Sequence, residues 1–235
     1  MVITRVKENV EFENRTGCIC EHEWNIDMQQ KRLPRRGTAF AKDAKVGKAS
    51  RRSAIWFKKV IETRIAESMG FDKYKQIMEM VRKTDVSSDP DFQRTFNGFY
   101  RVRRNAEWRK TYYDLFESVK GSNPSFEYII RTMYEATENI EASFSSKMLA
   151  TINPDMPIWD RYVVQNLCLN IKGKTKEDQL KCAVDLYDQM LSWYANFLQT
   201  ENGRDCIVEF DRTLPGYVWM SDVKKIDFYL WSIRD

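Results

Sequence analysis

Residues 143–164 read SFSSKMLATINPDMPIWDRYVV and contain the features on which the interpretation of the whole chain depends. Three serines open this stretch, and small hydroxyl side chains favour the start of a helix, where they cap backbone N–H groups. Pro154 ends that helix, because proline cannot continue it. Asp160 follows the apolar pair Ile158 and Trp159 and is a preferred cap for the next helix. The stretch therefore predicts two short helices joined by an apolar loop.

Apolar residues recur at helical spacing along most of the chain beyond residue 52. Glycine is scarce at nine residues and aromatic residues make up 13% of the sequence, which favours helices packed through large side chains. The helix that follows Asp160 is expected to run to about Asn170. Further helix starts are predicted at Ser53, Asp89-Pro90, Asn105, Asn123-Pro124, Thr175 and Ser221-Asp222.

These patterns predict an all-α fold with a single helical domain at residues 53–235. Residues 1–52 lack helical periodicity and are expected to form a small non-helical N-terminal arm, extended at first and basic at its end. No apolar run approaches the ~20 residues of a membrane span, and the N-terminus shows no secretory signal. Five cysteines at irregular spacing do not form a disulfide framework. We expect a cytoplasmic monomer that does not bind membranes.

Several classes of site are excluded or disfavoured by the sequence. Neither GxGxxG nor GxxxxGK[ST] occurs, so no nucleotide-binding loop of these types is expected. His22 is the only histidine, which excludes a catalytic triad based on histidine. Cys18, Cys20 and His22 form CxCxH, which is not a standard zinc spacing. No metal and no cofactor are predicted.

Positive charge is concentrated in one segment of the chain. Residues 31–64 carry twelve basic and two acidic residues, a charge of +10, although the whole chain carries only +4. Such a segment can neutralise a polyanion, but it is equally compatible with a solvated surface. A second basic cluster contains Arg101 and Arg104, which helical spacing would place on one side of a helix. The candidate phosphate-binding residues of the basic arm are Arg35, Arg36, Lys45, Lys48, Arg51 and Arg52.

The predicted helix start near Ser143 has the properties of an anion site. Its first N–H groups and the helix dipole both favour a phosphate. Lys147 is expected in the first turn, where the helix dipole disfavours a cation. Another interaction is therefore expected to offset this unfavourable effect. Simpler interpretations are ordinary capping by the serines, a surface or phosphate-binding role for Lys147, and a plain cap at Asp160.

The order of a tight turn, a helix-start lysine, a short helix, an apolar loop and a capping aspartate resembles the helix-hairpin-helix DNA glycosylases, especially their 8-oxoguanine-glycosylase-like branch. The resemblance implies that Ser143, Ser145 and Ser146 lie in a hairpin that binds a DNA phosphate. It also implies that Lys147 matches the helix-start lysine and Asp160 the catalytic aspartate. Both glycines of the family hairpin are serines here, Ser143 and Ser145, and the spacing from lysine to aspartate, 13 residues, is shorter.

The function that this resemblance implies is excision of a damaged or modified base from double-stranded DNA. The base would be extruded from the helix, and it could be oxidised, alkylated or hypermodified as in phage DNA. Asp160 would stabilise the oxocarbenium character of the sugar, while a lyase step through Lys147 is left open. The alternative is a non-catalytic DNA- or RNA-binding protein that uses the same surfaces. A role in repair and a role in phage defence are both open, and residues 221–228 carry no chemistry that the sequence assigns.

Overall fold

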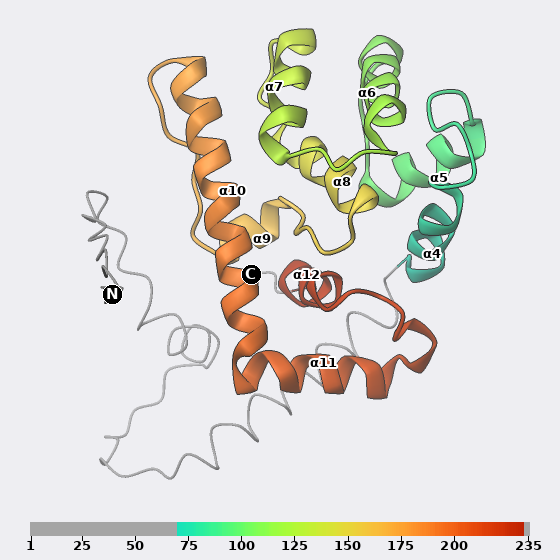
Figure 1. Ribbon diagram of the computed structural model, residues 1–235, viewed down its shortest axis with the longest axis vertical. Helices are drawn as coiled ribbons and strands as arrows, with labels where there is room; N and C mark the ends of the chain where they lie inside the picture. Colours follow the sequence, from blue (N-terminus) through green and yellow to red (C-terminus); the bar gives the residue numbers. More distant parts are fainter. Residues whose placement is uncertain (1–69, 233–235) are drawn as a thin grey trace, which may run out of the picture. The chain divides into compact units, whose positions relative to one another are not determined.

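A computed structural model describes residues 70–232 of the chain, which all lie in the unit Lys45–Asp235. These residues form helices joined by short loops, and no strand occurs among them (Figure 1). The α-helices are α4 (Phe71–Met80), α5 (Pro90–Tyr100), α6 (Ala106–Val119), α7 (Phe126–Thr137), α8 (Ala142–Ile152), α9 (Arg161–Asn166), α10 (Lys176–Gln199), α11 (Glu201–Thr213) and α12 (Asp222–Ser232); η2 (Pro215–Tyr217) is a single 3₁₀ turn.

Part of the sequence-based interpretation lies outside the described residues. This applies to the N-terminal arm at residues 1–52, to the helix predicted after Ser53 and to the CxCxH motif. It also applies to the basic residues Arg35, Arg36, Lys45, Lys48, Arg51 and Arg52. Within residues 70–232, the predicted all-α character is confirmed.

Several helix starts are confirmed by their capping hydrogen bonds. Asp89 caps α5 by accepting hydrogen bonds from the backbone N–H groups of Asp91 and Phe92, each at 2.9 Å. Asn105 caps α6 through the N–H of Trp108. Thr175 begins α10 with a reciprocal capping box that involves Asp178. These starts are predictable because each cap involves side chains within three residues of the helix start.

Three helix boundaries differ from the prediction. α7 begins at Phe126 rather than after Asn123, because the Ser125 hydroxyl accepts a hydrogen bond from the N–H of Tyr128. α8 begins at Ala142, before the first serine. α9 ends at Asn166, and the left-handed backbone at Cys168, with φ of 55°, prevents the helix from continuing to Asn170.

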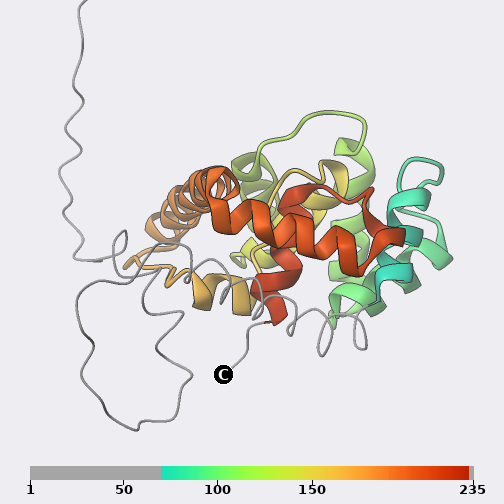
Figure 2. The ribbon, with the colours of Figure 1, turned by 90° about the horizontal axis from the view of Figure 1, so that it is seen from below.

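α11 was not predicted, since few apolar residues mark its buried face. Thr200 both ends α10 and caps α11, so the two helices meet at a sharp turn (Figure 2). Gly203 lies inside this turn, where a Cβ atom would come within 2.1 Å of the Phe197 carbonyl oxygen. Only glycine permits such a close approach of the two backbones.

Helix α12 runs through the middle of the described region, with α4, α9, α10 and α11 around it (Figure 1). Its buried side chains occur all around the helix rather than along one face. A helix buried on all sides is normally apolar throughout. α12 is an exception, because Lys224, Lys225 and Asp227 are buried with its apolar residues.

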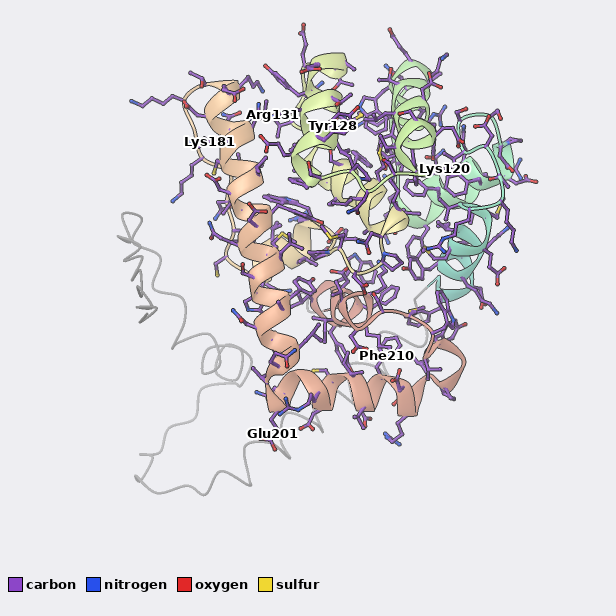
Figure 3. All side chains as sticks on the ribbon, in the orientation of Figure 1. Lys120, Tyr128, Arg131, Lys181, Glu201 and Phe210 are labelled. Atoms are coloured by element: carbon purple, nitrogen blue, oxygen red, sulfur yellow. The ribbon has the colours of Figure 1, made fainter. Side chains whose placement is uncertain are left out.

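Aromatic side chains fill the space between the helices (Figure 3). Phe210 on α11 is fully buried, and its ring is packed edge-on against Phe71 with ring centroids 6.1 Å apart. Phe126 on α7 stacks on Tyr187 of α10 with centroids 3.9 Å apart. Trp108, Tyr112 and Phe116 on α6 are buried as well. Among the helices of residues 70–232, none combines the length and apolar character that a bilayer crossing requires.

Candidate functional site

The three serines at residues 143–146 lie inside α8 rather than in a turn before it. Ser145 and Ser146 are 0% exposed, so their hydroxyl groups face the protein interior. The Ser146 hydroxyl donates to the Ser143 carbonyl oxygen at 3.0 Å and accepts from the Trp159 N–H at 2.8 Å. The expected capping by these two hydroxyl groups is therefore wrong, because both residues lie within α8 and are buried.

Glu141 occupies the N-cap position just before α8, but its side chain makes no capping hydrogen bond to the helix. Its buried carboxylate instead accepts hydrogen bonds from Arg104 at 2.8 Å and from Trp108 Nε1 at 3.1 Å. The Arg104 guanidinium also lies 5.4 Å from the centroids of the Trp108 and Phe144 rings. Arg104 thus has a structural partner in the protein.

Arg101 and Arg104 do not share a helix face. α5 ends at Tyr100, and Arg101 follows it with a left-handed backbone, φ of 54°. Arg104 lies in the loop before α6. The predicted arrangement was wrong because it assumed that the helix continued through both residues.

Lys147 is the sixth residue of α8, so it lies in the second turn and not in the first. Its side chain is 8% exposed, and its Nζ donates a hydrogen bond to the Ser143 hydroxyl at 3.0 Å. The same Nζ lies 4.9 Å from the centroid of the Phe144 ring. Burial lowers the pKa of Lys147, and the negative charge of Asp160 partly opposes this effect.

Asp160 caps α9, as predicted, by accepting a hydrogen bond from the N–H of Tyr162 at 2.9 Å. The loop that precedes it is attached to three helices through its backbone. Tyr187 of α10 donates to the Pro157 carbonyl oxygen at 2.8 Å, and Ser146 of α8 accepts the Trp159 N–H. Between them, the Ile158 N–H lies 3.3 Å from both carboxylate oxygens of an aspartate on α12, which is described below. These bonds hold the position of Asp160.

Lys147 and Asp160 both line one open cavity of about 470 Å³. This volume lies in the range of roughly 300–1,000 Å³ that is common for small-ligand sites. Aromatic rings from four segments line the cavity with them, including Phe99, Phe144 and Trp231. The two residues that the sequence singled out are thus brought to the same cavity.

A second lysine and aspartate line the same cavity, and the sequence analysis missed both. Lys224 and Asp227 lie one turn apart on α12, and Nζ of the lysine is 3.9 Å from the carboxylate. Both side chains are buried. Asp227 also accepts a hydrogen bond of 2.5 Å from the hydroxyl of Tyr194.

Burial shifts the pKa values of both members of this pair toward neutrality. Desolvation raises the pKa of Asp227 to about 6, although Lys224 and the hydrogen bonds from Tyr194 and Ile158 oppose the shift. Desolvation lowers the pKa of Lys224 to about 8, and the positive charge of Lys147 acts in the same direction. The negative charges of Asp227 and Asp160 oppose that shift. The cavity therefore holds groups that can exchange protons near neutral pH.

One signal in the sequence could have indicated the second pair. Lys224 and Asp227 are spaced by three residues in a segment that also contains Ile226 and the apolar run Phe228–Leu230. Spacing by three places the two charges on one side of a helix. Only the burial of the entire helix shows that this side is not solvated.

The described residues offer no cluster of histidine, cysteine, aspartate and glutamate side chains that could hold a metal ion. Exposed cations do lie at the cavity, namely Lys73, Arg101 and Arg161. Comparisons of the chain with protein-family models, with curated proteins and with solved structures found no match. The site must therefore be interpreted from its own geometry.

Proposed function

We propose that the protein is a DNA glycosylase, which hydrolyses the N-glycosidic bond of a damaged or modified base that is extruded from double-stranded DNA. The observation that carries this proposal is the presence of Asp160 and Lys147 in one cavity lined by aromatic rings. Neither residue type in isolation would support it. The modified base could be oxidised, alkylated or hypermodified.

The chemistry of glycosidic cleavage suits the environment of Asp160. As the bond to the base breaks, positive charge develops on the sugar, and a fixed carboxylate next to the ring stabilises it. The three backbone bonds of residues 157–159 hold Asp160 in place before the substrate arrives. Such preorganisation is the largest contribution to many enzymatic rate enhancements.

The surroundings of Asp160 suit an extruded nucleotide. Aromatic rings provide stacking surfaces for a base, and Phe99, Tyr162 and Trp231 are among those at the cavity. Lys73, Arg101 and Arg161 are exposed there and can contact the phosphates on either side of the nucleotide. These features are shared with the alternative, a protein that binds nucleic acid without cleaving it.

Base release from defined duplexes distinguishes the two functions. Duplexes that carry single oxidised, alkylated or hypermodified bases are incubated with the full chain, and alkali then converts abasic sites into strand breaks. We expect Asp160→Asn to lower the rate of break formation at least about 100-fold, while binding measured by fluorescence anisotropy stays unchanged. Asn is an equally good helix cap, so α9 should be retained.

Asp155→Asn is the matched control, since Asp155 is an exposed aspartate in the same loop, five residues before Asp160. This variant should form breaks at the wild-type rate. Break formation that survives in Asp160→Asn would remove Asp160 from the mechanism. Tight binding by all three proteins without breaks in any duplex would establish the non-catalytic alternative.

A further inference from the structure

We infer that Lys224 is the amine of this cavity that condenses with an aldehyde, and that the aldehyde is the C1′ carbon of an abasic deoxyribose. The identity of the aldehyde rests on the proposed function, because an abasic site is the product of base excision. The reactivity of Lys224 does not rest on it. Lys147 is the lysine that the sequence suggests for this step, so the inference changes the assignment of the nucleophile.

Lys224 combines burial with access to the cavity. It is 4% exposed and lines the cavity from α12. Its Nζ lies 4.8–4.9 Å from the ring centroids of Tyr74 and Phe228 and 5.8–6.0 Å from those of Tyr100 and Phe99. Within residues 70–232, this amine donates no hydrogen bond, and the carboxylate of Asp227 at 3.9 Å is its ion-pair partner.

Lys147 is also buried at this cavity, but the partners of its amine differ. Its Nζ is engaged in the hydrogen bond to Ser143, and no carboxylate in the described part of the chain lies within ion-pair distance of it. Lys224 has a carboxyl group beside it that can accept and return a proton. A nucleophilic amine needs such a partner, because condensation with an aldehyde requires proton transfers.

The electrostatics of the cavity support the same assignment. At a pKa of about 8, roughly a tenth of Lys224 is neutral at pH 7, compared with well under one in a thousand for an ordinary lysine. The charged groups that act on it are Asp227, Asp160 and Lys147, while the rings of Tyr74 and Tyr100 favour the ammonium form by cation–π attraction. Desolvation has a larger effect on the pKa of Lys224 than this attraction and the two carboxylates together, so the pKa is lowered.

The side chains of the site can supply and accept the protons that the condensation requires. The neutral Lys224 amine attacks the C1′ carbonyl carbon, and a proton moves from nitrogen to the carbonyl oxygen to form a carbinolamine. The carboxyl group of Asp227 donates a proton to the departing hydroxyl group, so water leaves and a C=N bond forms. The Asp227 carboxylate left by this step accepts the C2′ proton, a C2′=C3′ double bond forms, and the 3′ phosphate departs with the electron pair of the C3′–O bond. The strand is thus broken without any oxidant or reductant, and water then hydrolyses the C=N bond to release Lys224.

Reductive trapping on the wild-type chain tests the inference without DNA. The full chain is treated with 2-deoxyribose 5-phosphate, which carries the same aldehyde, and with sodium cyanoborohydride, which reduces the C=N bond to a stable amine. Peptide mass spectrometry then locates the adduct. We expect it on Lys224, with a labelling rate that is half-maximal near pH 8. Exposed lysines should react only at higher pH.

Three variants sharpen the assignment. Lys224→Gln should reduce the adduct at least tenfold. Lys147→Gln should leave the adduct on Lys224 but slow its formation at neutral pH, because the positive charge of Lys147 helps to lower the pKa of Lys224. Lys225→Gln is the matched control, since Lys225 is equally buried on α12 but is paired with Asp211 at 2.8 Å. If Lys224→Gln fails to fold, the position of the adduct on the wild-type chain still shows which lysine is the nucleophile.

An adduct on Lys147, or one spread evenly over exposed lysines, overturns the inference. The same trapping on a duplex with a preformed abasic site separates the two proposals. Labelling of Lys224 without base release from any modified duplex refutes the glycosylase but leaves the reactive lysine. Base release without labelling of Lys224 refutes the inference alone.

Discussion

The cavity contains two pairs of the same residue types, and their surroundings differ. Lys147 comes from the middle of α8, whereas Asp160 caps the start of α9 and is partly exposed there. Lys224 and Asp227 come from a single helix, α12, and each is less than 5% exposed. The first pair resembles a motif that can be recognised in sequence, whereas the second does not.

The difference shows how burial, rather than residue type, determines what a charged side chain does. Asp160 keeps a local capping bond to Tyr162, and this bond exists wherever α9 forms. Asp227 joins α12 to the Ile158 N–H and to Tyr194 on α10, so it holds together parts of the fold that are distant in sequence. We therefore expect Asp227 to contribute more to stability than Asp160 does.

The largest expected effect is on folding when Asp227 is removed. Asp227→Ala leaves Lys224 buried without its ion-pair partner and leaves Tyr194 and Ile158 without their acceptor. We expect a loss of about 3–5 kcal/mol in the free energy of unfolding, measured by urea denaturation. Asp160→Ala should cost only about 1 kcal/mol, the value of a helix cap. Equal losses in the two variants would contradict the proposed difference between the pairs.

The next effect is a dependence of stability on pH that belongs to the second pair. Burial raises the pKa of Asp227 to about 6, above the value of about 3.9 in an unfolded chain. Between these values the native protein binds a proton that the unfolded chain releases, so this carboxyl group's contribution to stability is lost as the pH rises through 6.

Urea denaturation of the wild-type chain and of Asp227→Asn at several pH values measures this contribution. The unfolding free energy of the wild type, relative to the variant, should fall by on the order of 3 kcal/mol between pH 4 and pH 7. A difference that stays constant over this range would show that Asp227 titrates alike in both states.

The smallest effect concerns the loop at residues 157–159, which precedes Asp160 and is hydrogen-bonded to Asp227. Tyr187→Phe removes the hydrogen bond to the Pro157 carbonyl oxygen without changing any charged residue. We expect a loss of about 1–2 kcal/mol in unfolding free energy, because a buried acceptor is left without its donor. If the loop positions Asp160, base release should slow more in this variant than the stability loss alone explains.

Tyr128→Phe is the matched control for that variant. Tyr128 is 54% exposed on the outer side of α7 (Figure 3), so losing its hydroxyl group should change stability by less than about 0.5 kcal/mol. A similar loss in both variants would mean that the Pro157 bond contributes nothing specific.

Much of the helical framework was predictable from the sequence, because its signals are local. Asp89, Asn105 and Thr175 cap helices as expected, and Asp160 does as well. One predicted helix start was wrong because a neighbouring residue, Ser125, caps α7 in place of Asn123. α11 was missed because few apolar residues mark its buried face. The site was predictable only in part, since its second pair lies on a helix whose burial involves four other helices.

The sequence by itself determined where most helices begin, and it singled out Asp160 as the carboxylate that caps α9. Capping needs only the residues within about one turn of the helix start, so it can be predicted without the fold. Tertiary structure decided that Ser145 and Ser146 face the interior, and that Lys224 and Asp227 share the cavity with Lys147 and Asp160. Those outcomes depend on contacts such as Ile158 with Asp227, 69 residues apart, and on the desolvation that such contacts cause.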